Sequence, residues 1–117
     1  MGAERRRFSR IKVRFLVEYR GEKIWQNARA DNLSKGGLFI ITDKTEPKGT
    51  EIEVIFDFGK GDRRTFQARG EVAWSREEPK TLEDGSVLPA GMGIEFKKLF
   101  PQDAERYLDE IIKHWKE

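Results

Sequence analysis

The sequence predicts a mainly β protein, a small antiparallel six-stranded β-barrel with one C-terminal α-helix. Apolar residues alternate with polar or charged ones along several short segments, which is the period of a strand with one buried face. Turns that contain glycine or proline separate these segments at about 8–12-residue spacing, as in small barrels. With 117 residues the chain fits one domain that needs no disulfide or metal to form its core.

The first three strands are predicted in the N-terminal half. Residues 11–20 alternate over their whole length, and residues 23–32 form a weaker second strand. The turn "SKGG" at 34–37 follows, and the short apolar run "LFIIT" at 38–42 suits a strand buried on both faces. The inward residues expected from the first strand are Ile11, Val13, Phe15, Val17 and Tyr19.

Three further strands and a helix are predicted in the second half. Alternation resumes from Ile52 to Phe58, and the turn "GKGD" leads into a strand from Phe66 to Trp74. Trp74 shares the apolar face of that strand, so we expect it in the core rather than as a stacking platform. A polar loop at 77–86 separates this strand from the last one, "GMGIEF" at 91–96.

From residue 101 the apolar residues fall at helical spacing, which predicts a terminal helix over 101–116. Pro101 suits the first position of a helix, because its missing N–H needs no partner there. The apolar stripe consists of Ala104, Tyr107, Leu108, Ile111, Ile112 and Trp115.

Basic residues gather at the N-terminus. Residues 1–20 hold seven Lys or Arg and two Glu, whereas the rest of the chain holds 16 basic and 19 acidic groups. Such asymmetry indicates an anion-binding arm on a near-neutral body, and it disfavours a general nucleic-acid surface. We therefore expect a flexible, ligand-gripping basic arm at 1–10, attached to a barrel domain at 11–117.

Several classes of function are disfavoured. The chain has no cysteine, no apolar run after its N-terminal charges, and no stretch near the ~20 apolar residues of a membrane helix. We expect a cytoplasmic protein without a membrane contact.

No phosphate loop or paired-histidine motif is present, and Ser34 has no evident base, because the one histidine, His114, lies near the chain end. We therefore expect no enzyme, metal site or cofactor.

Two short motifs carry the functional expectation. The first is Arg-x-x-x-Arg at Arg6 and Arg10, just before the first strand, and the second is Asn-x-Ser-x-x-Gly at Asn32, Ser34 and Gly37. Each alone is weak, but together, in this order and in a β domain of this length, they resemble the PilZ domain. PilZ domains are bacterial receptors for cyclic di-GMP, and the resemblance covers nearly the whole chain.

The resemblance implies a ligand site made of the arm and the turn. Arg6 and Arg10 would bind phosphate or guanine, since a guanidinium can fork onto either group or stack on a purine. Arg5 precedes the motif, at a position that in the family influences whether one ligand or a stacked pair binds. An arginine there is compatible with a pair, which brings four phosphates.

On the turn, Asn32 and Ser34 would hydrogen-bond a guanine, and Gly36 and Gly37 would provide close backbone approach. Many relatives carry Asp where this chain has Asn32, and an amide offers one neutral acceptor where a carboxylate offers two charged ones. Asp31 is adjacent, but alternation along a strand predicts that its side chain faces the other way.

The resemblance therefore implies a cyclic di-GMP receptor or adaptor that changes conformation on binding and signals to a protein. That effector would belong to motility, adhesion or exopolysaccharide machinery. The alternative is a PilZ-fold interaction adaptor that binds no nucleotide. The intact Arg6, Arg10, Asn32, Ser34 and Gly37 favour the first function.

Overall fold

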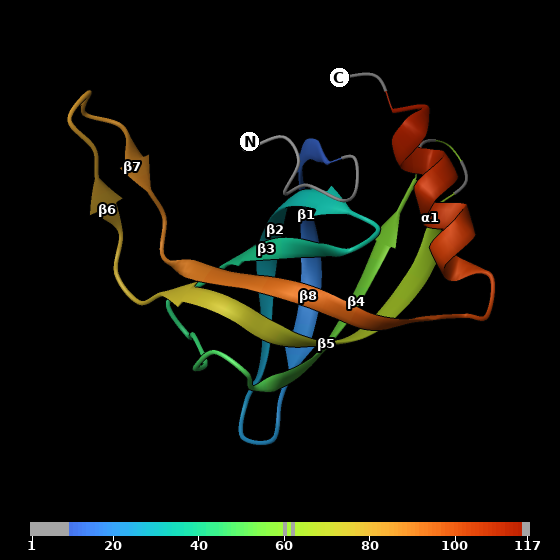
Figure 1. Ribbon diagram of the computed structural model, residues 1–117, viewed down its shortest axis with the longest axis horizontal. Coiled ribbons are helices and arrows are strands. Elements are labelled where there is room, and N and C mark those ends of the chain that lie inside the picture. The colour runs from blue at the N-terminus through green and yellow to red at the C-terminus, as the bar shows by residue number, and fades with distance from the viewer. Residues whose placement is uncertain (1–9, 60, 62, 116–117) are drawn as a thin grey trace.

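A computed structural model describes residues 10–59, 61 and 63–115 of the chain. Six long strands form a closed antiparallel barrel, with one helix after the last of them, which confirms the predicted fold class (Figure 1). The barrel strands are β1 (Ile11–Arg20), β2 (Trp25–Ser34), β3 (Gly37–Ile41), β4 (Glu51–Phe58), β5 (Arg64–Arg76) and β8 (Gly91–Phe100).

The barrel closes in the order β1-β2-β3-β8-β5-β4, and β4 returns to pair with β1. Barrel strands that follow one another in sequence are also neighbours in space, except for β3 and β4. The last strand, β8, lies between β3 and β5 and is thus hydrogen-bonded to both halves of the chain. Closure leaves the barrel without a free edge.

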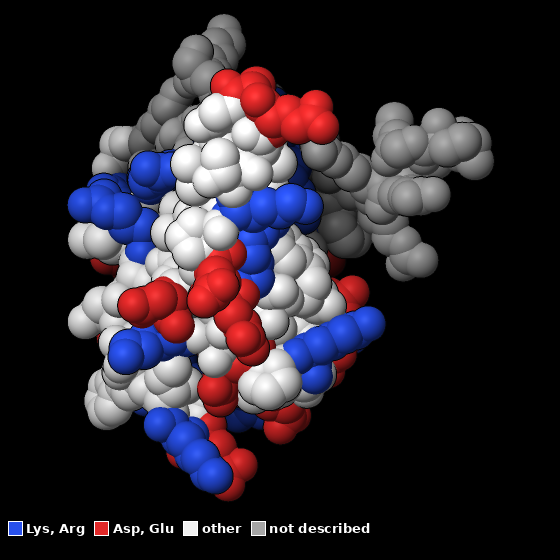
Figure 2. Space-filling model, turned by 90° about the vertical axis from the view of Figure 1, so that its left-hand side faces the viewer, with Lys and Arg blue, Asp and Glu red and all other residues white. Residues whose placement is uncertain are grey.

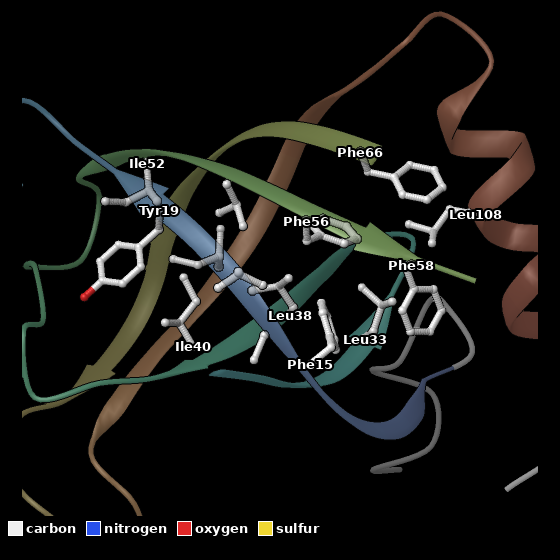
Figure 3. Close-up of a cluster of buried hydrophobic side chains, with 14 of the residues drawn as sticks. Phe15, Tyr19, Leu33, Leu38, Ile40, Ile52, Phe56, Phe58, Phe66 and Leu108 are labelled. Atoms are coloured by element: carbon white, nitrogen blue, oxygen red, sulfur yellow. The ribbon is translucent and has the colours of Figure 1, made fainter. Parts of the chain in front are cut away.

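The core follows the predicted alternation. Inward side chains from β1, β4 and β5 meet those of β3 and β8 inside the barrel, and Phe15 packs against Phe56 and Phe58 with ring centroids 5.5 and 5.3 Å apart (Figure 3). Tyr19 is fully buried, and its hydroxyl donates to the Lys44 carbonyl oxygen at 3.0 Å. Burial raises the pKa of the Tyr19 phenol, so it stays protonated in the core.

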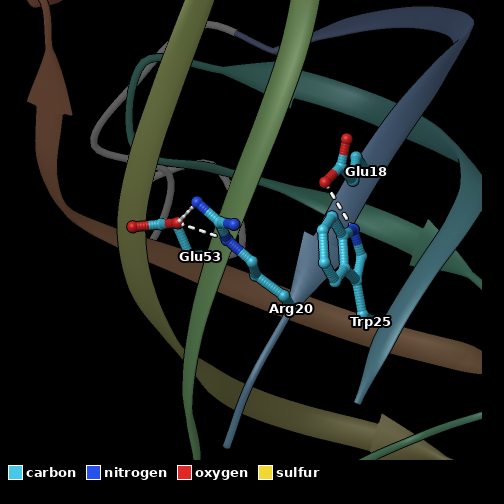
Figure 4. Close-up of polar contacts among 4 residues, drawn as sticks. All are labelled: Glu18, Arg20, Trp25 and Glu53. Atoms are coloured by element: carbon cyan, nitrogen blue, oxygen red, sulfur yellow. Dashed lines mark hydrogen bonds and ion pairs between the residues drawn. The ribbon is translucent and has the colours of Figure 1, made fainter.

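The seam between β1 and β4 carries an ion pair on its outer face. Arg20 and Glu53 lie directly opposite, and the Arg20 Nε donates to Glu53 Oε1 at 2.6 Å (Figure 4). This hydrogen bond lowers the pKa of the Glu53 carboxyl. Because the pKa is depressed in the folded state, the pair's small contribution is present at neutral pH and is lost as the pH falls through that pKa.

The terminal helix α1 runs from Ala104 to Lys113 and not over 101–116. The Ala104 N–H donates to the Pro101 carbonyl oxygen at 2.9 Å, so residues 101–104 form a turn that precedes the helix. Ala104, Leu108 and Ile112 are buried against the barrel. Beyond the helix end, the Trp115 ring stacks on Phe58 at 4.8 Å.

The segment predicted as a polar loop at 77–86 forms part of a small hairpin that extends to Leu88. Strands β6 (Lys80–Thr81) and β7 (Val87–Leu88) pair with each other in a sheet separate from the barrel, and they project from it (Figure 1). Two-residue strands are too short to show a periodic pattern, so alternation along the sequence does not reveal them. The hairpin joins the end of β5 to the start of β8.

Gly37 allows β3 to approach β8. A Cβ atom at this position would lie 2.1 Å from the Ile94 carbonyl oxygen, which belongs to the backbone of the neighbouring strand and cannot easily move. Gly37→Ala is therefore expected to lower the free energy of unfolding by about 1–3 kcal/mol, the usual cost of overpacking. Urea denaturation followed by tryptophan fluorescence measures the change.

Gly21→Ala is the matched control, because the nearest atom to a Cβ there is the end of the Ile52 side chain, 3.3 Å away. It should cost much less than Gly37→Ala. Equal stabilities for the two variants would contradict a structural role for Gly37.

Candidate functional site

An open groove of about 960 Å³ lies on the outside of the barrel. The start of β1, the β2–β3 turn and the outer faces of β3, β8 and β5 form its floor, and the base of the hairpin forms one wall. Its lining consists of Arg10, Lys12, Asp31, Asn32, Ser34, Gly36, Leu38, Phe39, Ala73, Trp74, Arg76, Leu88, Pro89, Gly93, Ile94 and Glu95.

The groove brings parts of the two sequence motifs together. Arg10 and Asn32 both line it, and the Arg10 Nη1 donates to the Asn32 carbonyl oxygen at 2.5 Å. This contact joins residues 22 positions apart in the sequence. Arg5 and Arg6, the other arginines expected at the site, lie outside the described residues with the rest of the arm at 1–9.

Ser34 has a structural role in the turn. It is only 1% exposed, and its hydroxyl oxygen accepts a hydrogen bond from the Gly36 N–H at 3.1 Å. The Gly36 carbonyl oxygen in turn accepts from the Phe96 N–H at 2.9 Å, which fixes the turn to β8. Ser34 and Gly36 line the groove, whereas Gly37 is absent from its lining and packs on β8.

A β-bulge places both Asp31 and Asn32 in the groove. The β2–β3 register shifts between Asp31 and Ser34, and Asn32 has a left-handed backbone with φ of 55°. An extra residue at a bulge breaks the strict alternation of strand faces. The expectation that Asp31 faces away from the site is therefore wrong. Its Oδ1 accepts from the Asn32 N–H at 2.9 Å.

Trp74 is 45% exposed on the groove side and not in the core as expected. The β5–β8 register shifts between Val72 and Trp74, so the strand changes face after the buried Val72. The indole lies over Gly93, where a Cβ atom would be 2.3 Å from Nε1, and it stacks on Phe39 with ring centroids 5.2 Å apart. We call Phe39 and Trp74 the aromatic shelf.

Arg76 extends the shelf toward the hairpin. Its guanidinium lies 5.2 Å from the centre of the Trp74 ring, a distance typical of a cation–π contact. Its Nη1 also donates to the Pro89 carbonyl oxygen at 2.7 Å, which ties the hairpin base to the shelf.

One row of directly opposed residues crosses the outer face of five neighbouring strands. We call it the outer row, and from β1 through β2, β3 and β8 to β5 it consists of Arg14, Asp31, Phe39, Gly93 and Trp74. Directly opposed residues in antiparallel strands project from the same face. The row therefore places the carboxylate of Asp31 beside the aromatic shelf.

The charges of the groove suit a small anion with planar groups. Arg10, Lys12 and Arg76 supply the cationic groups of the lining, and Asp31 and Glu95 the anionic ones. From the side of the molecule that carries the hairpin, acidic and basic side chains are interspersed across the surface (Figure 2). A long polyanion usually binds a broad basic face, and that pattern is not seen on this side.

The groove lining also includes Lys12, Phe39, Trp74 and Arg76, which no sequence motif predicts as site residues. They come from three strands that are far apart in sequence, and only the pairing of β8 between β3 and β5 brings the last three together.

Within residues 10–59, 61 and 63–115, no group of three His, Cys, Asp or Glu could hold a metal ion. No helix in that same part of the chain is both long and apolar enough to span a membrane.

Comparison with solved structures shows the same fold in two proteins of low sequence identity. The Escherichia coli YcgR PilZ domain with cyclic di-GMP aligns with a TM-score of 0.67 at 18% identity, over 93% of this chain and 89% of that chain. The Bacillus subtilis inhibitor of motility MotI, or DgrA, aligns with a TM-score of 0.73 at 14% identity, over 92% of this chain. This chain spans about half of that protein, 49% of its length.

No curated protein matches the chain in sequence. The family model named PilZ domain matches residues 4–114, which includes both sequence motifs and the whole barrel. The chain therefore belongs to the PilZ domain family.

Proposed function

We propose that this protein is a cyclic di-GMP receptor that acts as an adaptor for a protein effector, and that it is not an enzyme. The observation that carries the proposal is the groove, where Arg10 from the N-terminal motif meets Asn32 of the turn motif beside the aromatic shelf. The E. coli YcgR domain with the same fold is described with cyclic di-GMP, which supports the choice of ligand.

The groove offers separate groups for the two parts of such a ligand. Arg10 and Lys12 supply cationic groups for the phosphates, and Arg6 would add a second guanidinium from the arm. The exposed indole of Trp74 offers a flat surface for a guanine base. Asn32 supplies polar atoms for a base edge, and Ser34 and Gly36 hold the turn that presents it.

Binding would change the presentation of the N-terminal arm. Arg10 stands at the junction between the arm and β1, so a ligand held by both arm and groove would fix the arm against the barrel. A new surface made of arm, ligand and barrel would then be available to a protein effector. The B. subtilis protein with the same fold is an inhibitor of motility, which favours an effector in motility over adhesion or exopolysaccharide machinery.

Calorimetry with cyclic di-GMP tests the proposal directly. We expect saturable binding that is much tighter than binding of GMP or cyclic AMP, because neither offers two phosphates and two guanines to arm and groove together. The same titration gives the stoichiometry, one ligand or a stacked pair. Absence of binding at millimolar ligand would reject the receptor function and favour the interaction adaptor that binds no nucleotide.

Arg6→Ala and Arg10→Ala should each weaken binding by about 1.5–3 kcal/mol, the scale of hydrogen bonds to charged groups, or roughly ten- to hundred-fold in affinity. Each should also flatten the salt dependence of binding, because contacts to phosphate are screened as ionic strength rises. Thermal unfolding of Arg10→Ala should hardly change, since the residue is exposed. Unaltered affinity in both variants would show that the arginines do not hold the ligand.

Trp74→Ala should weaken binding by about 1–3 kcal/mol, the scale of base stacking on an aromatic side chain. Trp25→Ala is the matched control, because Trp25 is 67% exposed at the start of β2 and does not line the groove. Fluorescence should agree with calorimetry, since a stacked guanine would quench Trp74. A loss of affinity in Trp25→Ala with none in Trp74→Ala would place the ligand elsewhere.

A further inference from the structure

The turn motif does not provide a charged acceptor for the two donors on the edge of a guanine. A guanine presents two adjacent donors on its Watson–Crick edge, the N1–H and the N2 amino group. Asn32 can offer these donors a single neutral oxygen, because the other half of its amide is itself a donor. A carboxylate would accept from both donors, with stronger, charge-assisted hydrogen bonds.

Asp31, the residue before Asn32, offers such a carboxylate. Asp31 lines the groove, and its side chain is 27% exposed. Its Oδ1 accepts from the Asn32 N–H at 2.9 Å, which holds the side chain in place. Its Oδ2 faces Arg14 Nη2 at 3.7 Å, longer than a hydrogen bond, and Arg14 is itself 60% exposed. The carboxylate therefore keeps acceptor capacity toward the groove.

The outer row gives Asp31 the right position relative to a stacked base. Asp31 lies on β2 directly opposite Phe39 of β3, and the Trp74 indole lies over Gly93 of β8. Asp31 and the position of the indole are thus two strand spacings apart, about 10 Å, and the Phe39 ring lies over β8 against the indole. A purine that stacks on the indole and reaches along the row would direct one edge at Asp31.

We propose that Asp31 is a specificity-determining residue of the groove, which accepts the N1–H and N2 amino protons of a guanine and so selects guanine over other purines. An adenine would present its N1 lone pair to the carboxylate and would be repelled. The proposal rests on the cyclic di-GMP function proposed above, and it assigns to Asp31 the acceptor role that the neutral Asn32 fills poorly.

The test compares the binding of two cyclic dinucleotides by calorimetry, cyclic di-GMP and cyclic di-inosine monophosphate. The second ligand differs from the first only in that its bases lack the N2 amino group. The wild-type chain should prefer cyclic di-GMP by about ten-fold or more, within the range of charge-assisted hydrogen bonds. Asp31→Asn should weaken cyclic di-GMP binding about 10–100-fold and reduce the preference to about three-fold or less. Asparagine keeps the Oδ1 acceptor for the Asn32 N–H, so the bulge should persist.

Asp57→Asn is the matched control for charge. Asp57 is a carboxylate on β4 that bonds the Thr65 hydroxyl at 2.6 Å and does not line the groove, so the preference should stay at its wild-type value. If Asp31 acts only as a negative charge near the phosphates, Asp31→Asn will tighten both ligands equally, which overturns the proposal. An unchanged preference in Asp31→Asn also overturns it.

The wild-type titrations separate this proposal from the proposed function. If neither ligand binds, the receptor function itself fails and Asp31 has no guanine to select. If both bind equally well to the wild-type chain, the receptor function stands and the role of Asp31 is rejected without any variant. Thermal unfolding of Asp31→Asn shows whether a loss of affinity comes from the fold.

Discussion

The groove depends on the glycines of β8. Gly91 and Gly93 lie where the side chains of two neighbouring strands cross over the backbone, and a Cβ atom on Gly93 would overlap the indole ring of Trp74. Because β8 presents no side chain there, Phe39 from β3 and Trp74 from β5 meet above it and stack. Aromatic residues placed across a glycine in this way also shield its exposed backbone.

Two bulges decide which side chains reach the groove. A barrel with unbroken alternation would bury Trp74 with Val72 and would turn Asp31 away from Asn32. The extra residues in β2 and β5 reverse the faces locally, while pairing continues on both sides of each bulge. The core keeps its regular pattern, and the irregular positions lie on the outer face where a ligand has access.

This division explains what can be predicted from the sequence. Most of the strands and their inward residues follow from alternation, and β3 follows from a short apolar run. Alternation is enforced because a slip of one residue would expose the whole buried face. The positions of Trp74 and Asp31 cannot be predicted in this way, because a bulge is a shift in the pairing between two strands and one strand's sequence does not reveal it. The β6–β7 hairpin is too short to leave a pattern, and the helix start is ambiguous because Pro101 suits a turn as well as a first helical position.

The two motifs differ in how strongly they indicate a ligand. Ser34 and Gly37 are accounted for by the turn itself, since one bonds the turn backbone and the other permits contact with β8. A PilZ barrel that bound nothing would still need them, so their presence indicates the fold and not the ligand. The exposed indole of Trp74 and the exposed Arg10 both line the groove, and neither has a comparable role in the core. The residues that favour a bound ligand are therefore those of the arginine motif and the outer row.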